Sequence, residues 1–250
     1  MLTSFLALYG REVARFRKLW LDTIFSPIVS VALYLSVFGI ITGGQMIGGM
    51  QYLTFVYVGL VSMALINSSF ANPAFALIIA KNVGTIVDLQ LVPLRPWLVS
   101  VAFAFAAATR AVVTLIVTVV LTAWFIPDMT IQHPFLALLF VILTGLQFGL
   151  LGVSFGMPAK NFEALTFMTT FVMQPMIFLA GVFYPISQLP GIWAKVALFN
   201  PIHHTINLLR WSTTGYSDIN PAISAVVAVG TLLVLLFTAH VTTKKCLYTR

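Results

Sequence analysis

Six long apolar stretches fill most of the 250 residues, and basic residues are concentrated in every second gap between them. The stretches lie at about residues 23–41, 52–80, 97–126, 135–157, 164–184 and 221–241. Each is close to or above the ~20 residues with which a helix crosses the hydrocarbon core of a bilayer. A membrane barrel would instead show alternating segments of ~10 residues. The pattern therefore predicts an all-α membrane protein with six transmembrane helices.

The composition excludes most soluble functions. Hydrophobic residues make up 60% of the chain and charged residues only 8%, whereas a soluble domain carries about 25% charged residues. The formal net charge of +7 is explained by topology and by contact with anionic membrane lipid, and no nucleic-acid partner is expected because no soluble basic face exists. The single cysteine, Cys246, offers neither a disulfide nor a cysteine-based metal cluster.

The basic residues also predict the orientation, because cytoplasmic loops of membrane proteins are enriched in Lys and Arg. Ten of the 13 lie in the N-terminal arm, the second-to-third gap, the fourth-to-fifth gap and the C-terminal tail: Arg11, Arg15, Arg17, Lys18, Lys81, Arg95, Lys160, Lys244, Lys245 and Arg250. The opposite gaps hold only Lys195 and Arg210. Both termini are therefore expected in the cytoplasm.

Two of the cytoplasmic segments have amphipathic sequences. In the arm from Phe5 to Trp20, apolar residues recur every three or four positions and basic residues follow another face, which predicts an interfacial helix. The loop Lys81–Pro96 mixes polar residues with Val83, Ile86, Val87 and Val92, and a short helix there would end before Pro93. Two interpretations fit these patterns. The arm and the loop could be a simple membrane anchor and a plain connector, or they could form a docking surface for a cytosolic partner.

Arg110 is the most informative polar residue within a predicted span. It lies about 20 Å along the third helix, near the middle of the membrane. A buried Arg costs at least ~2.5 kcal/mol there and must face protein or water. Thr114, Thr118 and Thr122 continue a polar stripe along the helix, and no acidic residue occurs at a comparable depth. Arg110 is thus expected either to join helices or to contact cargo.

Other polar groups lie in the second, fourth and fifth spans, and they are Asn67, Ser68, Ser69, Asn72, Gln147 and Gln174. Pro73 and Pro175 follow two of them, and local kinks are expected at both prolines. These groups could line a cavity or form interhelical hydrogen bonds worth ~0.6 kcal/mol each. The Phe and Met residues of the fifth span, Phe171 and Met173 among them, suit adaptable packing against a helix or a lipid-like cargo.

Several signals for enzymes are weak here. The G-x-S-x-G pattern from Gly152 to Gly156 needs a strand–turn–helix beneath it, whereas here it ends a predicted membrane helix. The adjacent His203 and His204 diverge by about 100° on a helix and chelate a metal poorly. The sequence contains no G-x-x-x-x-G-K-[ST] loop for ATP. We therefore expect no enzyme activity, no metal site and no cofactor in this chain.

The segment after the fifth span is apolar but interrupted by prolines. It reads GVFYPISQLPGIWAKVALFNP from Gly181 to Pro201, which is too broken to cross the membrane as one helix. We expect short re-entrant helices that enter the outer leaflet without crossing it. Asn220 and Pro221 then provide the cap and first turn of the last span.

The pattern of Gly181, Tyr184-Pro185, Leu189-Pro190, Trp193 and Asn200-Pro201 resembles the permease subunits of ABC type-2 exporters. That family includes polysaccharide, nodulation-factor and drug-efflux permeases. The basic arm, the six spans, the loop ending in Val92-Pro93-Leu94 and the position of Arg110 extend the resemblance over the whole chain.

The resemblance implies a single transmembrane permease domain, residues 1–250, in the bacterial cytoplasmic (inner) membrane. Two copies would dock two separate cytosolic P-loop ATPase subunits, which would bind ATP and Mg. The coupling surface would include Lys81, Ile86, Val87, Asp88, Arg95, Arg11 and Arg15. The substrate path would include Arg110, Thr114, Asn67, Asn72, Gln174, Phe171 and Met173. The external gate would include Tyr184, Pro185, Pro190, Trp193, Asn200 and Pro201.

The class of cargo is left open among drug, lipid and glycan, with a weak preference for an amphipathic or lipid-linked molecule. An ATP-independent channel or secondary transporter is the main alternative function. Such a protein should show intramembrane acidic residues or inverted repeats. The six acidic residues all lie near span ends or in loops, and no repeat is evident. A non-transporting membrane scaffold is harder to distinguish from sequence alone.

Overall fold

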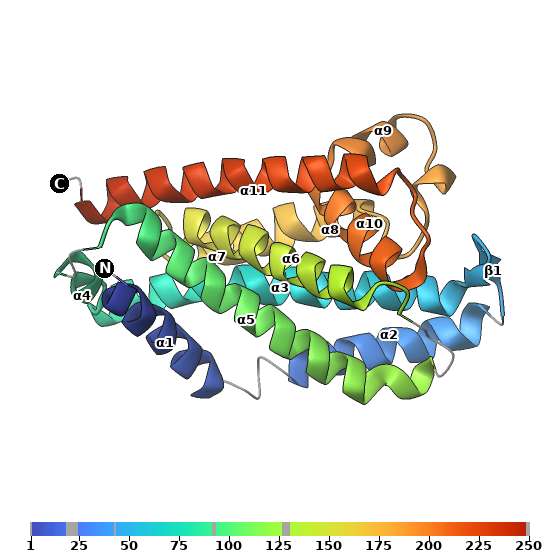
Figure 1. Ribbon diagram of the computed structural model, residues 1–250, viewed down its shortest axis with the longest axis horizontal. Coiled ribbons are helices and arrows are strands. Elements are labelled where there is room, and N and C mark those ends of the chain that lie inside the picture. The colour runs from blue at the N-terminus through green and yellow to red at the C-terminus, as the bar shows by residue number, and fades with distance from the viewer. Residues whose placement is uncertain (1, 19–24, 43, 92–93, 127–130, 249–250) are drawn as a thin grey trace.

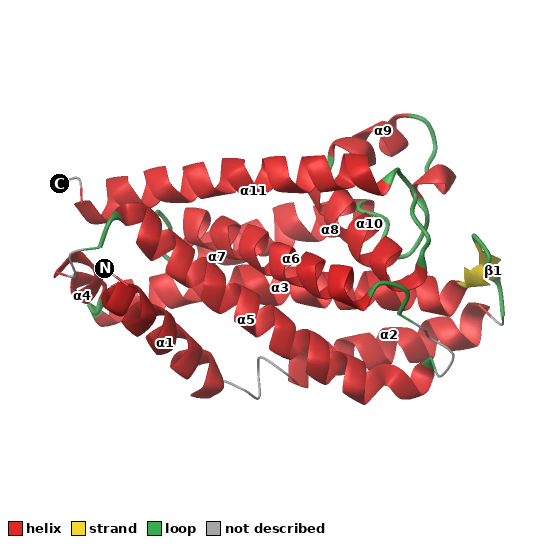
Figure 2. Cartoon of the chain, viewed as in Figure 1, coloured by secondary structure: helices red, strands yellow, loops and turns green. Residues whose placement is uncertain are grey.

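The structure is a computed structural model that describes residues 2–18, 25–42, 44–91, 94–126 and 131–248, and it is almost wholly helical (Figures 1 and 2). Five helical segments of this described part are long and apolar enough to cross a membrane. They are α3 (Tyr52–Val83), α5 (Pro96–Thr122), α6 (Pro134–Gly156), Phe162–Leu179 and Pro221–Leu247. The predicted helical membrane fold is confirmed at this level.

The first predicted span, residues 23–41, corresponds to helix α2 (Ser26–Thr42), which is shorter than the five spanning segments. Residues 19–24, which precede it, lie outside the described part of the chain. A two-stranded antiparallel hairpin, β1 (Met46–Ile47) and β2 (Met50–Gln51), joins α2 to α3. Gly48 and Gly49 turn this hairpin with φ values of +57° and +83°, a conformation that glycine adopts without strain.

The remaining elements either flank the spans or are the parts from which the last two spans are built. They are α1 (Leu2–Lys18), α4 (Ile86–Leu91), η2 (Ala123–Phe125), α7 (Phe162–Phe167), the π-helix η3 (Met168–Met173), α8 (Gln174–Leu179), η4 (Ile186–Gln188), α9 (Ile192–Phe199), α10 (Pro201–Thr214), α11 (Pro221–Thr243) and the π-helix η5 (Lys244–Tyr248). The broken segment before the last span is therefore helical in short pieces. That these pieces are re-entrant stays a prediction.

The spanning helices run along the long axis of the molecule (Figure 1). Helices α1 and α4 and both marked chain ends lie at one end of the bundle, and the β hairpin and α9 lie at the other. The two segments predicted to be cytoplasmic docking elements thus share an end, which we call the α4 end.

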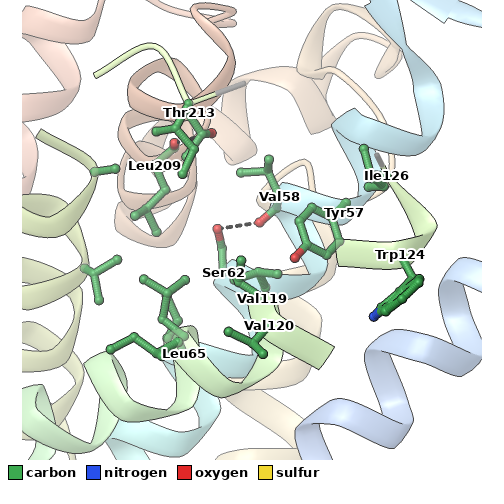
Figure 3. Close-up of a pocket in the computed structure, with 16 residues that line it drawn as sticks. Tyr57, Val58, Ser62, Leu65, Val119, Val120, Trp124, Ile126, Leu209 and Thr213 are labelled. Carbon is green, nitrogen blue, oxygen red and sulfur yellow. Dashed lines mark hydrogen bonds between the residues drawn. The ribbon is translucent and has the colours of Figure 1, made fainter. Parts of the chain in front are cut away.

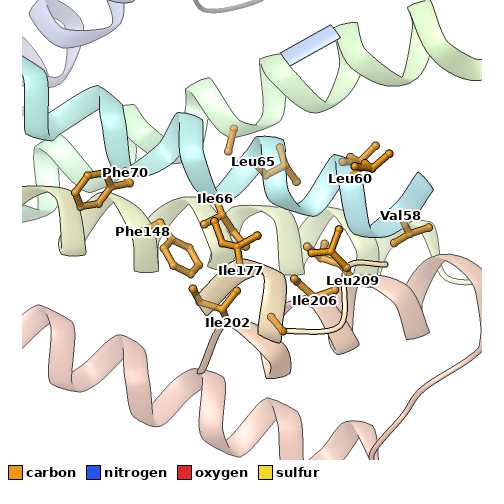
Figure 4. Packing of buried hydrophobic residues seen from close by; sticks show 14 of the residues in the cluster. Val58, Leu60, Leu65, Ile66, Phe70, Phe148, Ile177, Ile202, Ile206 and Leu209 are labelled. Atoms are coloured by element: carbon orange, nitrogen blue, oxygen red, sulfur yellow. The ribbon is translucent and has the colours of Figure 1, made fainter. Parts of the chain in front are cut away.

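Helix α3 lies at the centre of the bundle and is buried along most of its length. Its core side chains pack against α6, α8 and α10 (Figure 4); the labelled members are Val58, Leu60, Leu65, Ile66, Phe70, Phe148, Ile177, Ile202, Ile206 and Leu209. The short helix α10 is therefore anchored in the interior by its apolar face.

Small residues allow α6 to approach its two neighbours closely. A Cβ at Gly145 would lie 2.4 Å from the Cα of Ala108 in α5, and one at Gly152 would lie 2.4 Å from the carbonyl oxygen of Phe70 in α3. Such contacts are the usual role of glycine between membrane helices. The G-x-S-x-G pattern is thus a packing motif within α6, and the Oγ of Ser154 donates to the Leu150 carbonyl of the same helix.

The two intramembrane prolines have different consequences. The π-helix η3 directly precedes α8, whose second residue is Pro175. Proline cannot donate a backbone hydrogen bond and crowds the preceding turn, so a widened turn relieves the strain. A helical irregularity thus precedes Pro175, and α3 continues as one helix through Pro73. The kinks at the two prolines stay predictions.

Candidate functional site

A cavity of about 330 Å³ between α2, α3, α5 and α8 brings together three of the predicted path residues, Asn67, Arg110 and Gln174. Ser30, Tyr34 and Ser68 add hydroxyl groups to its wall. The Nε of Arg110 and the Oε1 of Gln174 are buried and have no hydrogen-bond partner among the described residues. We call this the Arg110 cavity. It gathers polar groups inside an otherwise apolar bundle.

The other predicted path residues do not line this cavity. Thr114 and Met173 are buried in the helix packing, and so is Asn72, whose backbone carbonyl accepts a hydrogen bond from Arg15 at 3.3 Å. Phe171 is 68% exposed and stacks on Phe167, with 5.2 Å between the ring centroids. It therefore faces the surroundings of the bundle.

Helix α1 packs against α5 at the α4 end. The ring of Phe5 meets Phe105 edge-on at 6.3 Å, and the hydroxyls of Tyr9 and Thr109 are 2.8 Å apart. Phe5 and Tyr9, which helical spacing placed on the apolar face of this segment, both lie at the contact with α5.

A charge cluster within α1 was not predicted. Glu12 is buried, and its carboxylate pairs with Arg15 at 2.6 Å and with Arg11 at 3.3 Å. Burial raises the pKa of the Glu12 carboxyl, and the two guanidinium groups partly oppose that shift. Two predicted coupling residues, Arg11 and Arg15, thus hold a buried carboxylate within α1.

The predicted coupling loop forms the helix α4, with one face turned outward. Val87 and Leu91 are 48% and 77% exposed, and their four-residue spacing places them on one side of α4. Val83, the last residue of α3, is 69% exposed beside them in the sequence. Ile86 and Leu89 pack inward instead. The exposed apolar ridge therefore consists of Val83, Val87 and Leu91, which we call the α4 ridge, and Asp88 and Arg95 are exposed near it.

Lys81 has a structural role that the sequence did not reveal. Its ammonium donates to the carbonyls of Gly156 at 2.9 Å, Ala159 at 2.8 Å and Met157. These carbonyls lie at and just beyond the C-terminus of α6, where a cation satisfies unpaired acceptors and the negative end of the helix dipole. Lys81 thus ties the end of α3 to the end of α6.

Replacing Lys81 by Met should therefore lower the stability of the purified protein by about 2 kcal/mol, because charge-assisted hydrogen bonds are lost. Thermal unfolding in neutral detergent measures the effect. Lys160→Met, which removes an exposed cation from the α6–α7 connection, serves as the control and should be near neutral. Equal melting temperatures for the two variants would show that the capping contacts contribute no stability.

The predicted gate residues lie on the short helices between α8 and α11 and in the connections between those helices. The Nδ2 of Asn200 donates to the Met176 carbonyl at 2.6 Å, and its Oδ1 caps α10 by accepting from the Ile202 amide at 3.0 Å. The hydroxyl of Tyr184 donates to Phe178 at 2.9 Å. Pro185 and Pro190 precede η4 and α9, Pro201 begins α10, and Trp193 is half exposed. Hydrogen bonds from Tyr184 and Asn200 to carbonyls of α8 therefore hold this segment against that helix.

Arg210 is the most deeply buried charged group of that segment, and sequence analysis treated it only as a loop charge. Its Nη2 donates to the Gly181 carbonyl at 2.8 Å, and its Nη1 lies 3.5 Å from the Asp218 carboxylate. Its guanidinium carbon lies 3.7 Å from the ring centroid of Phe55. Burial lowers the pKa of Arg210 to about 10, so the group remains protonated near neutral pH.

Asp218 and Tyr216 complete this cluster. The Tyr216 hydroxyl donates to Asp218 at 3.0 Å. Burial raises the pKa of the Asp218 carboxyl, and burial together with the Asp218 charge raises the pKa of Tyr216 to about 12. The cluster joins α3, the turn at Gly181, α10 and the loop before α11, and we call it the Arg210 cluster.

A second, larger cavity of about 660 Å³ lies between α3, α5, α6 and α10 (Figure 3). Its wall is mainly apolar, and its hydroxyls bond to protein atoms. Ser62 donates to Val58 at 2.7 Å, and Thr213 donates to Leu209 at 2.8 Å. The cavity therefore offers hydrocarbon contact and little else. Sequence analysis did not predict this cavity, because it forms only where four separate helices pack together.

The two adjacent histidines are held by backbone carbonyls. His203 Nδ1 lies 3.0 Å from the Ala180 oxygen and His204 Nε2 lies 2.8 Å from the Leu198 oxygen. Within the described residues, no group of three His, Cys, Asp or Glu side chains could hold a metal ion. The contacts of both histidines are those of structural residues.

The sequence profile of ABC-2 type transporters matches residues 3–213. The chain belongs to the ABC-2 type transporter family. Its relatives include the inner membrane transport permease YadH of Escherichia coli (strain K12), which is 28% identical over 215 residues, or 85% of this chain and 84% of YadH.

Two further relatives of this ABC-2 family member are nodulation J proteins. Nodulation protein J of Rhizobium meliloti (strain 1021) is 27% identical over 222 residues, or 83% of this chain and 80% of that protein. Nodulation protein J of Sinorhizobium fredii (strain NBRC 101917 / NGR234) is 30% identical over 190 residues, or 70% of this chain and 68% of that protein. The resemblance drawn from the proline-broken segment is confirmed, and the chain is a membrane transport protein of the permease type.

Proposed function

We propose that the chain is the transmembrane permease subunit of an ATP-binding cassette exporter in the bacterial cytoplasmic membrane. It would cross the membrane six times, with both termini in the cytoplasm, and move an amphipathic, lipid-linked or glycan cargo outward. Membership of the ABC-2 family supports this proposal. So does the similarity over most of the chain to a relative named as an inner membrane transport permease.

The α4 ridge is the observation that carries the proposal. Val87 and Leu91 on α4 and Val83 at the end of α3 are exposed apolar side chains, and α4 lies at one end of the bundle (Figure 1). An exposed apolar ridge is characteristic of a helix that lies in the groove of a partner. The chain has no nucleotide-binding loop, so the partner on this ridge would be a separate P-loop ATPase that binds ATP and Mg.

The transport cycle would couple this docked partner to the spanning helices. α4 directly follows α3, the central helix that also forms one wall of the Arg110 cavity. A movement of α4 imposed by ATP binding would therefore reach the substrate path through a single continuous helix. The energy of ATP binding supplies the difference between inward-facing and outward-facing states that a population shift requires.

A second copy of the chain would complete the path. One side of α2 is apolar and exposed at Val29, Leu33, Val37 and Ile40, and Phe167 and Phe171 are exposed on the fifth helical segment. These faces suit a second permease and the surrounding lipid. The segment from Tyr184 to Trp211 would form the external gate at the opposite end from α4.

Changing two residues of the α4 ridge tests the docking surface. Val87→Glu together with Leu91→Glu should reduce the amount of ATPase that co-purifies with the protein by about tenfold or more, because apolar anchors carry most of the energy of such interfaces. Quantitative mass spectrometry of the affinity-purified complex measures the ratio of the two proteins.

The matched control is Met46→Glu with Ile131→Glu, which places two charges on exposed apolar side chains outside α4. This control should keep its ATPase. Equal ATPase recovery in all three proteins would show that the ridge is not the docking surface. Membrane insertion, followed by yield and elution volume, should be unchanged in both variants.

A further inference from the structure

The guanidinium of Arg110 has no carboxylate partner among the described residues. No residue that lines the Arg110 cavity is acidic, and the buried carboxylates of Glu12 and Asp218 pair with other arginines. Asp218 pairs with Arg210. An unpaired charge inside a membrane protein is costly, and such groups bind one another, water or a ligand.

A second cation lies on the same side of the bundle. Arg15 donates to the carbonyl of Asn72 in α3, the residue next to Ala71 of the cavity wall. The carboxylate on α1, Glu12, is already shared by Arg15 and Arg11. Glu12 therefore balances part of the charge of Arg11 and Arg15 and is not paired with Arg110, so the local charge balance is positive.

The remaining polar groups of the cavity suit an oxyanion. Asn67 and Gln174 carry amides and Tyr34 carries a hydroxyl that can donate hydrogen bonds. The hydroxyl of Ser68 already donates to the Leu65 carbonyl at 3.1 Å. The buried Nε of Arg110 is a donor with no partner, and the unpartnered Oε1 of Gln174 can accept from a protonated phosphate or from water. A volume of about 330 Å³ lies at the small end of the range for ligand pockets and suits a headgroup.

We propose that the Arg110 cavity binds an anionic headgroup, a phosphate or carboxylate carried by an amphipathic molecule of the membrane. The headgroup would pair with Arg110 and take hydrogen bonds from the amides and the Tyr34 hydroxyl around it, while its alkyl chain would remain among the helices or in lipid. Charge-assisted hydrogen bonds to a guanidinium are among the strongest that proteins form. Whether this amphiphile is cargo rests on the proposed export function, whereas the binding does not.

Binding can be measured on the purified full chain in a neutral maltoside detergent. The probes are phosphatidylglycerol, phosphatidylcholine and dodecyl phosphate, each titrated while the melting temperature is followed. Phosphatidylglycerol or dodecyl phosphate should raise the melting temperature, and phosphatidylcholine should not. In Arg110→Gln the apparent affinity for the anionic probe should fall about ten- to a hundredfold.

Two further variants separate binding from folding. Lys160→Gln removes an exposed cation of the same charge and should keep the response, and Arg110→Lys should keep most of it. Without any anion, Arg110→Gln should melt at the same temperature as the unchanged protein or higher, because an unpaired buried charge has been removed. A purely structural arginine would give a lower melting temperature and no probe-dependent difference.

The outcomes identify the source of the headgroup. A response to phosphatidylglycerol that depends on Arg110 supports the site and assigns it to a membrane phospholipid. A response to dodecyl phosphate alone, again dependent on Arg110, supports the site and assigns it to a single-chain anionic amphiphile of the kind that could be cargo. No Arg110-dependent response to either probe, or an equal loss in Lys160→Gln, overturns the inference. Co-purification of the ATPase is measured separately, so its presence in Arg110→Gln would leave the export proposal standing even then.

Discussion

Replacing Arg210 by Met should lower the stability of the protein by about 3–5 kcal/mol, the usual cost of removing one partner from a buried ion pair. The change would leave the Asp218 carboxylate and the Gly181 carbonyl without their buried partner and would remove the guanidinium from the face of Phe55. Thermal or chemical unfolding in detergent micelles measures the loss. Cleavage by added protease in the turn at Gly181 should also become faster.

Two controls make the Arg210 result specific. Lys195→Met removes an exposed cation from the same outer segment and should change stability by less than about 0.5 kcal/mol. Arg210→Met combined with Asp218→Asn should recover part of the loss, because neither charge is then left buried alone. A loss of less than about 1 kcal/mol in Arg210→Met, or no recovery in the double variant, would contradict the role given to the ion pair.

Gly145→Val should be at least as damaging, with a loss of about 3 kcal/mol or more and a low yield of inserted protein. A Cβ at this position would lie 2.4 Å from the Cα and 3.0 Å from the Cβ of Ala108, so α5 and α6 would have to move apart. Overpacking that shifts backbone reaches the upper end of the usual destabilisation. Fluorescence-detected size-exclusion chromatography after heating measures both yield and stability.

The control for Gly145 is Gly230→Val in α11, where a Cβ would meet no atom within 4 Å. This variant should behave almost like the unchanged protein, because valine is readily accommodated on an open face of a membrane helix. If the two valine variants lost stability equally, helix propensity and not the close approach of α5 and α6 would be the cause.

The spanning helices could be predicted well from sequence because their signals are local. Pro134 and Pro221 start α6 and α11, within one residue of the predicted bounds, since proline suits the first turn of a helix. The helix in the Lys81–Pro96 loop was also placed correctly, because its apolar spacing is visible in a few residues. Six spans were predicted, whereas five segments of the described part of the chain reach spanning length, and α2 is shorter than these.

The polar pairings could not be predicted, because they depend on which helices become neighbours. Lys81 belongs to a basic cytoplasmic loop by sequence, and its contact with the end of α6 requires the packing of α3 against α6. Arg210 and Asp218 meet across the turn at Gly215, whose left-handed backbone ends α10. Ile86 was expected on the coupling surface together with Val87, but the rotation of α4 turns Ile86 inward. The orientation of so short a helix follows from tertiary contacts.

The composition of the native complex tests the central claim most directly. The protein, tagged and expressed in its own cells, should be extracted in mild detergent and its intact mass determined by native mass spectrometry. We expect two copies of this chain with two copies of a soluble P-loop ATPase. An assembly of this chain alone, stable under conditions that preserve other membrane complexes, would contradict the exporter proposal and favour a channel or secondary transporter.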